Sequence, residues 1–136
     1  IDNKEAATEL AQGALAECRK RGFQVAVSVV DRGGNVQVIL RDRFAGPHTT
    51  ETARRKAWTA VSFRTDTQAM ATLTQPGELT FGTRQIPGAL MLGGGVPIEA
   101  GGSIVGGVGV SGAPGGDSDD ACARAGIEAI IDKLEF

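Results

Sequence analysis

The chain has 136 residues with 14 Lys and Arg against 16 Asp and Glu, so its net charge of -2 indicates neither nucleic acid nor an acidic surface as partner. With one Trp and no Tyr, it lacks the aromatic side chains on which single-stranded nucleic acids stack. No apolar run approaches the ~20 residues that a membrane-spanning helix needs, so we expect no membrane partner. The length predicts one domain over residues 1–136.

The pattern of apolar residues predicts an α+β domain. Apolar residues recur at intervals of three and four in four segments, which predicts helices over residues 2–21, 49–63, 65–73 and 117–136. Runs rich in β-branched or other apolar residues predict strands at 23–31, 35–41, 89–92, 96–100 and 103–112. Glycine pairs join the first two strands and the last two strands, as in hairpins, so we expect an antiparallel sheet with helices packed against it.

Polar residues mark the starts of two predicted helices. Thr65 and Gln68 have the spacing of a capping box at the start of the third helix. Asp117, Asp119 and Asp120 crowd the start of the last helix. We expect them to cap its free N–H groups and to complement the helix dipole.

Residues 107–112, GVGVSG, match the pattern G-x-G-x-x-G. A dinucleotide-binding fingerprint needs a strand that ends at the first glycine and a helix that begins at the last. Here the strand-forming residues continue, and no helix can begin before about Asp117. We therefore expect no nucleotide here, and interpret the glycines as allowing close approach of a helix, a partner subunit or a ligand. Ser111 lacks the strand–turn–helix context of a nucleophile elbow.

Cys18 and Cys122 are the two cysteines, and each falls on an apolar face of a predicted helix. Their spacing fits no metal site. We expect both to be buried as small hydrophobic side chains, with a disulfide between them as the less favoured alternative. The chain begins at Ile1, which is compatible with removal of a signal peptide, so a cytoplasmic and a secreted location both stay open.

Three blocks of the sequence, residues 29–42, 53–67 and 90–126, resemble the haem-binding, haem-degrading protein family. The longest reads LMLGGGVPIEAGGSIVGGVGVSGAPGGDSDDACARAG. That family includes glycolate-utilisation accessory proteins and the C-terminal domain of one type of cobalamin adenosyltransferase. The resemblance implies a profilin-like fold, with an antiparallel sheet and helices on both faces, and assembly into homodimers or larger homo-oligomers.

The resemblance also implies haem or a related tetrapyrrole as the ligand, with haem sensing or degradation as associated functions. The Glu-x-x-Glu iron-binding pair of the secreted sensor branch is missing, since Arg54 follows three residues after Glu51 and Ile131 three after Glu128. This departure argues against iron storage and redox sensing of that type. Whether the protein is an enzyme stays open.

His48 is the single histidine, and it lies on a loop just before the second predicted helix. Loops on a rigid scaffold often carry function, and imidazole is a common axial ligand of haem iron. We interpret His48 as a candidate axial ligand; the alternative is a surface or helix-capping histidine without a ligand. One histidine cannot build a catalytic zinc site on three histidines.

Charge is distributed unevenly along the chain. Residues 41–64 hold six Lys and Arg against two acidic residues, whereas residues 113–136 hold two against six. Arginine pairs well with carboxylates, so the basic segment can meet haem propionates or a small carboxylate. Alternatively, the opposite charges meet across a subunit interface or are solvated. The candidate ligand-binding arginines are Arg41, Arg54 and Arg55.

The loop at residues 112–117, GAPGGD, precedes the last predicted helix. Its exposed N–H groups can bind a ligand oxygen, which makes Gly112, Pro114 and Gly115 candidate ligand-binding residues. The alternative is a tight turn.

The sequence therefore predicts a small-molecule-binding protein that does not bind nucleic acid. The leading hypothesis is haem binding, with His48 as axial ligand and with Arg54 and Arg55 near the propionates. The alternative is an accessory protein of small-molecule catabolism that binds a small carboxylate, such as glycolate, without haem.

Overall fold

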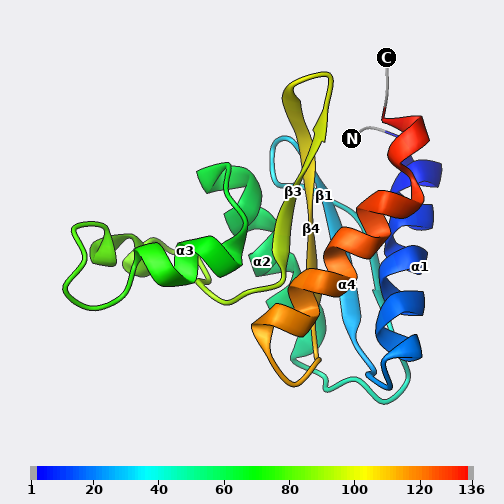
Figure 1. Ribbon diagram of the computed structural model, residues 1–136, viewed down its shortest axis with the longest axis horizontal. Coiled ribbons are helices and arrows are strands. Elements are labelled where there is room, and N and C mark those ends of the chain that lie inside the picture. Colours follow the sequence, from blue (N-terminus) through cyan, green and yellow to red (C-terminus); the bar gives the residue numbers. More distant parts are fainter. Residues whose placement is uncertain (1–2, 135–136) are drawn as a thin grey trace.

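The computed structural model describes residues 3–134, which form a four-stranded antiparallel sheet with helices on either side (Figure 1). The strands are β1 (Ala26–Asp31), β2 (Val36–Arg41), β3 (Gly95–Ala100) and β4 (Ser103–Ser111). They lie in the order β2-β1-β4-β3, and each neighbouring pair is antiparallel. The two predicted hairpins are therefore joined side by side, because β1 of the first pairs with β4 of the second.

Helices cover both faces of this sheet, which confirms the predicted α+β class. The helices are α1 (Lys4–Lys20), α2 (Thr49–Phe63), α3 (Thr67–Leu73) and α4 (Gly116–Ala129), with 3-10 turns η1 (Phe81–Gln85) and η2 (Ile131–Lys133). Helices α1 and α4 pack together on one face, and α2 lies on the other (Figure 1). None of the helices within residues 3–134 combines the length and the apolar character needed to cross a bilayer.

The main hydrophobic core lies between the sheet and the α1–α4 layer. Alternate strand residues point into it, because successive side chains of a strand face opposite sides of the sheet. Fully buried examples are Val27, Val29, Ile98, Val108 and Val110. A smaller cluster beneath α3 contains Met70, Ala89 and Met91, with Trp58 and Phe63 packed against it.

The glycine-rich strand β4 allows α2 to lie directly on the sheet. A Cβ atom on Gly109 would lie 2.0 Å from the carbonyl oxygen of Ala53, and one on Gly107 would lie 2.8 Å from that of Ala57. Both contacts are shorter than any real Cβ atom tolerates. The sequence left open whether a helix, a partner subunit or a ligand approaches this segment. The structure places a helix, α2, against these two glycines.

The cysteines are both fully buried, as predicted, but the expectation that they are free was wrong. Cys18 of α1 and Cys122 of α4 form a disulfide. The two helices approach closely at Gly126, where a Cβ atom would lie 2.6 Å from the carbonyl oxygen of Leu10. This close packing brings the two cysteine Cα atoms to 5.6 Å, which is within bridging distance.

Three local expectations were also wrong. Residues 89–92 form no strand; Ala89 and Met91 are buried in the small cluster beneath α3. Asp66, and not Thr65, caps α3, since its Oδ1 accepts a hydrogen bond from the N–H of Ala69 at 2.8 Å. Helix α4 ends at Ala129 and is followed by η2, and residues 135–136 of the predicted helix lie outside the described range.

Candidate functional site

A cavity of about 680 Å³ lies beside α2, at the end of the sheet where β4 stops. Three parts of the chain line it: the first half of α2 with the loop before it, residues 90–93 with α3, and the loop at 111–116 that leads into α4. Its volume is within the range of roughly 300–1,000 Å³ that ligand pockets occupy.

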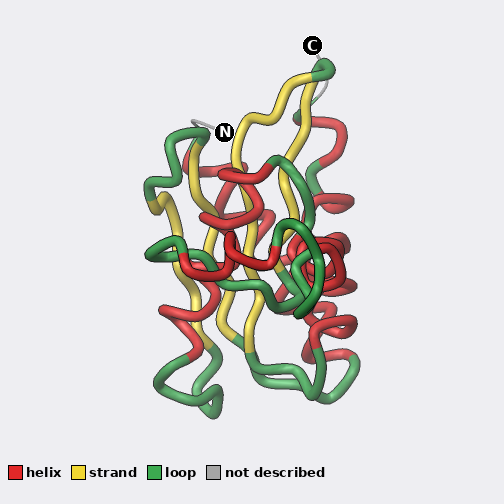
Figure 2. The backbone as a smooth tube through the Cα atoms, turned by 90° about the vertical axis from the view of Figure 1, so that its left-hand side faces the viewer, coloured by secondary structure: helices red, strands yellow, loops and turns green. Residues whose placement is uncertain are grey.

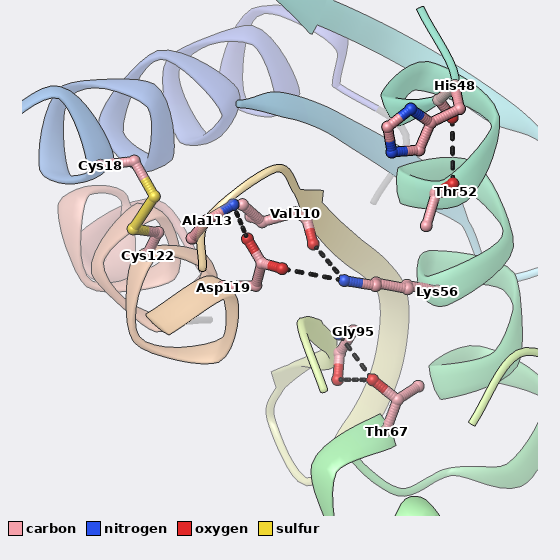
Figure 3. Close-up of polar contacts among 10 residues, drawn as sticks. All are labelled: Cys18, His48, Thr52, Lys56, Thr67, Gly95, Val110, Ala113, Asp119 and Cys122. Atoms are coloured by element: carbon pink, nitrogen blue, oxygen red, sulfur yellow. Dashed lines mark hydrogen bonds and ion pairs between the residues drawn. A yellow bond between two sulfur atoms is a disulfide. The ribbon is translucent and has the colours of Figure 1, made fainter. Parts of the chain in front are cut away.

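One stripe of α2 faces this cavity. His48, Thr52 and Lys56 follow one another at intervals of four residues, so their side chains project from the same side of the helix. Figure 3 shows the His48 ring and the Lys56 ammonium turned toward the loop that carries Ala113. The stripe thus places an imidazole, a hydroxyl and an ammonium along one wall.

His48 is exposed at the rim of the cavity, as its predicted loop position implied. It occupies the N-cap position of α2, but its side chain makes no capping hydrogen bond. The ring lies over Gly46, where a Cβ atom would come within 2.7 Å of the imidazole Cε1. Among the described residues, none is hydrogen-bonded to its ring nitrogens, so the imidazole is available to a ligand.

Lys56 and Asp119 form an ion pair at the inner end of the cavity, where they are 3% and 4% exposed. The Lys56 Nζ lies 3.0 Å from Asp119 Oδ2 and donates to the carbonyl oxygen of Val110 at 2.9 Å (Figure 3). The other Asp119 oxygen accepts from the N–H of Ala113 at 3.0 Å. Asp119 was expected to cap the free N–H groups of α4, which was wrong: its carboxylate bonds to Lys56 and to the N–H of Ala113, and so joins α2 to the 111–116 loop.

Burial raises the pKa of Asp119, although Lys56 and the N–H of Ala113 act in the opposite direction. The nearby charge of Asp117 adds to the rise. Removing this carboxylate from water therefore costs more than its partners return. A buried titratable pair beside a cavity is typical of a functional site.

Gly94, in the middle of a run of three glycines, lies directly against the ion pair. A Cβ atom on Gly94, whose φ is +126°, would lie 2.8 Å from the Cβ of Asp119 and 3.0 Å from Lys56 Nζ. A Cβ atom on Gly93 would lie 2.8 Å from the carbonyl oxygen of Gly116. A side chain at Gly94 would therefore push this segment away from the ion pair, and one at Gly93 would push it away from the start of α4.

The structure brings four of the predicted site residues to the cavity: His48, Arg55, Gly112 and Gly115. The Arg55 guanidinium is already engaged, since it donates to the carbonyl oxygens of Gly88 at 3.4 Å and Ala89 at 2.9 Å. It therefore holds the 88–92 segment against α2, next to the apolar wall formed by Leu90 and Leu92.

The other three predicted residues are not among those that line the cavity. Arg54 forms a two-point ion pair with Glu51 at 2.7 and 2.8 Å. Arg41 donates to the carbonyl oxygen of Ala45 at 2.7 Å. Pro114 is exposed on the loop. Ligand contacts for Arg54, Arg41 and Pro114 stay predictions.

Sequence reasoning missed Lys56 and Asp119 as site residues. The available signal was Lys56 itself, which lies among Ala53, Ala57 and Ala60 on the buried face of α2. A lysine on an apolar stripe needs a partner, because an unpaired buried charge is very unfavourable. The basic residues 41–64 and the acidic residues 113–136 indicated that such a partner was present. Lys56 and Asp119 belong to these two segments, and they pair within one chain.

Comparison with known proteins identifies the family. A family model described as haem degrading protein HbpS-like matches residues 3–128. The chain is 32% identical over 124 residues to corrinoid adenosyltransferase PduO of Salmonella typhimurium. The aligned region is 90% of this chain but only 37% of that protein. It is 30% identical over 111 residues to Protein GlcG of Escherichia coli, covering 82% of this chain and 81% of that one.

Solved structures agree. A double mutant of Streptomyces reticuli HbpS shares 45% identity, with a TM-score of 0.88 over 94% of this chain and 86% of that chain. A complex of PduOC with haem shares 30% identity, with a TM-score of 0.87 over 93% and 92% of the two chains. The sequence resemblance is thereby confirmed, and the chain belongs to the HbpS-like family of haem-degrading proteins.

Proposed function

We propose that this protein binds haem in the cavity beside α2, with His48 as the axial ligand. The observation that carries the proposal is a lone imidazole, free of other hydrogen bonds to the described residues, at the rim of a partly apolar cavity in a chain of this family. Imidazole is a common axial ligand of haem iron. Within residues 3–134 no three His, Cys, Asp or Glu side chains gather to hold a bare metal ion.

The residues present fit such a ligand. Ala71, Leu90 and Leu92 supply apolar surface in the cavity lining, beside the polar residues of α2. Leu92 is 52% exposed at present, and a flat apolar ring system would cover it. When bound, haem would supply a redox-active iron; the role of this chain is to bind and orient it.

Substituting His48 with alanine is expected to shift the Soret band of the haemin complex and to weaken haemin binding about tenfold or more. A tenfold loss of affinity corresponds to about 1.4 kcal/mol of binding free energy. The reason is loss of the axial nitrogen. The measurement is a haemin titration followed in the Soret region, with wild-type protein expected to saturate at one haem per one or two subunits.

Lys20→Ala is the control, because Lys20 is exposed on α1 and is not among the residues that line the cavity. We expect its titration to resemble that of the wild type. An unchanged spectrum and affinity for His48→Ala would show that another residue binds the iron. A selective loss of affinity in Arg54→Ala would support the prediction that this arginine meets a propionate.

A second candidate function is binding of a small carboxylate without haem. The observation that favours it is Lys56, a buried cation that lines the cavity and is suited to a carboxylate of any size. A featureless haemin titration, together with a thermal shift on adding glycolate, would favour this function over the first.

We also infer assembly into homo-oligomers, supported by an arm that projects from the body of the protein. The arm comprises α3 and residues 74–88, at the left of Figure 1 and toward the viewer in Figure 2. Arg84 fixes it by donating to the carbonyl oxygens of Thr74 and Ala71. Yet two of its apolar side chains face solvent: Leu79 is fully exposed, and Phe81 is 40% exposed. Apolar side chains gathered on an ordered protrusion indicate a protein interface.

Leu79→Asp is therefore expected to shift the protein toward the monomer, because it places a charge where a second copy would bury an apolar side chain. Sedimentation velocity of wild type and variant at matched concentrations checks this. The control is Gln12→Asp, an exposed polar position on α1 outside the arm. If the wild type is monomeric at high micromolar concentration, the arm does not mediate self-association.

A further inference from the structure

Lys56 has hydrogen-bonding capacity that the protein itself does not use. An ammonium carries three N–H donors. Two are directed to the carbonyl oxygen of Val110 and the carboxylate of Asp119. Among the described residues no third acceptor is bonded to Nζ, although the side chain is buried and lines the cavity. The third donor is therefore left for a molecule inside the cavity.

Stability alone does not explain this arrangement. A buried ion pair contributes little, because the cost of removing two charges from water offsets their attraction. The positions around Lys56 on α2, Ala53, Ala57 and Ala60, are small and apolar, so a methionine would suit this face of the helix. Gly94 lies directly against the pair and leaves no room there for another side chain.

We propose that Lys56 binds the ligand and selects for a carboxylate group on the part of the ligand that reaches the inner end of the cavity. Asp119 is then the residue that positions the Lys56 ammonium. The proposal rests on the proposed cavity site but not on haem itself, because haem and glycolate both carry carboxylates. Arg55, another cation on the wall, is already bound to two backbone carbonyls. Asp119 directs Lys56 while its own charge is balanced by Lys56 and the N–H of Ala113.

The experiment compares haemin with haemin dimethyl ester, in which both carboxylates are blocked. In titrations, the wild type should bind haemin more tightly than the ester. Lys56→Met should bind haemin about 10- to 100-fold more weakly than the wild type does, but should bind the ester with the same affinity as the wild type. Lys20→Met, at an exposed lysine of α1, is the control and should keep the preference. A merely structural role would lower both affinities together, and a preserved preference in Lys56→Met would overturn the proposal.

Lys56→Met leaves Asp119 without its cation and can weaken the fold. The double variant Lys56→Met/Asp119→Asn avoids this, because the asparagine oxygen can still accept from Ala113 and no buried charge is left. We expect it to fold, as checked by circular dichroism, and to bind haemin and its ester equally. A folded double variant that still prefers haemin would contradict the assignment.

Failure of the haem proposal can be told apart from failure of this one. If wild-type protein does not bind haemin, calorimetry with glycolate and its neutral amide, glycolamide, tests Lys56 directly. A preference for glycolate that Lys56→Met abolishes would sustain the role of Lys56 while removing haem. No binding of either compound, or equal binding, would overturn both the carboxylate selectivity and the role of Lys56.

Discussion

Gly109→Ala is expected to lower the free energy of unfolding by about 3 kcal/mol or more, at the upper end of the effect of overpacking. The new methyl group would lie 2.0 Å from the carbonyl oxygen of Ala53 and 2.7 Å from the backbone nitrogen of Ala57. Both are backbone atoms inside α2, so no side-chain rotation relieves the clash. The helix must move off the sheet, and it carries His48 and Lys56 with it.

Urea denaturation followed by circular dichroism gives the stability, and a haemin titration of the same variant reports on the site. The control is Gly82→Ala in η1, where an added Cβ meets nothing within 4 Å. We expect that control to stay within about 0.5 kcal/mol of the wild type. Equal denaturation midpoints for Gly109→Ala and wild type would mean that α2 does not pack against β4 as closely as described.

Removing the disulfide is expected to have a comparable or larger effect. Cys18 and Cys122 are 104 residues apart in sequence, so the bridge closes most of the chain into one loop. A cross-link of that length restricts the unfolded chain by about 4 to 5 kcal/mol in the chain-entropy description. Cys18→Ala/Cys122→Ala should unfold at a correspondingly lower urea concentration.

The variant also provides its own control. Because both cysteines are fully buried, reduction requires unfolding, so a thiol reductant is included throughout the urea titration. The wild-type midpoint should then fall toward that of the double variant, whereas the variant should be unaffected by the reductant. If the reductant leaves the wild-type midpoint unchanged, the disulfide contributes no net stability.

Local sequence patterns were sufficient for the elements that have them. The alanine stripe predicted α2 at the bounds observed, Thr49–Phe63, and the glycine pairs predicted both hairpins. Helix periodicity and turn glycines act over a few residues, so they can be read without knowing the rest of the fold. His48 could be named as a candidate ligand because it is the one histidine of the sequence, and the structure places it at the cavity; its role as a ligand stays a prediction.

Tertiary structure decided what depends on residues far apart in the chain. Residues 89–92 are apolar enough for a strand, but packing against Met70 and Trp58 fixes them as an irregular segment. The Cys18–Cys122 bridge depends on how closely α1 and α4 approach each other. The Lys56–Asp119 pair joins residues 63 positions apart. Charge and composition showed that such residues were present. Only the tertiary structure brings them to a common cavity, where α2, β4 and α4 meet at one end of the sheet. That geometry is set by close backbone packing at glycines and not by any local sequence pattern.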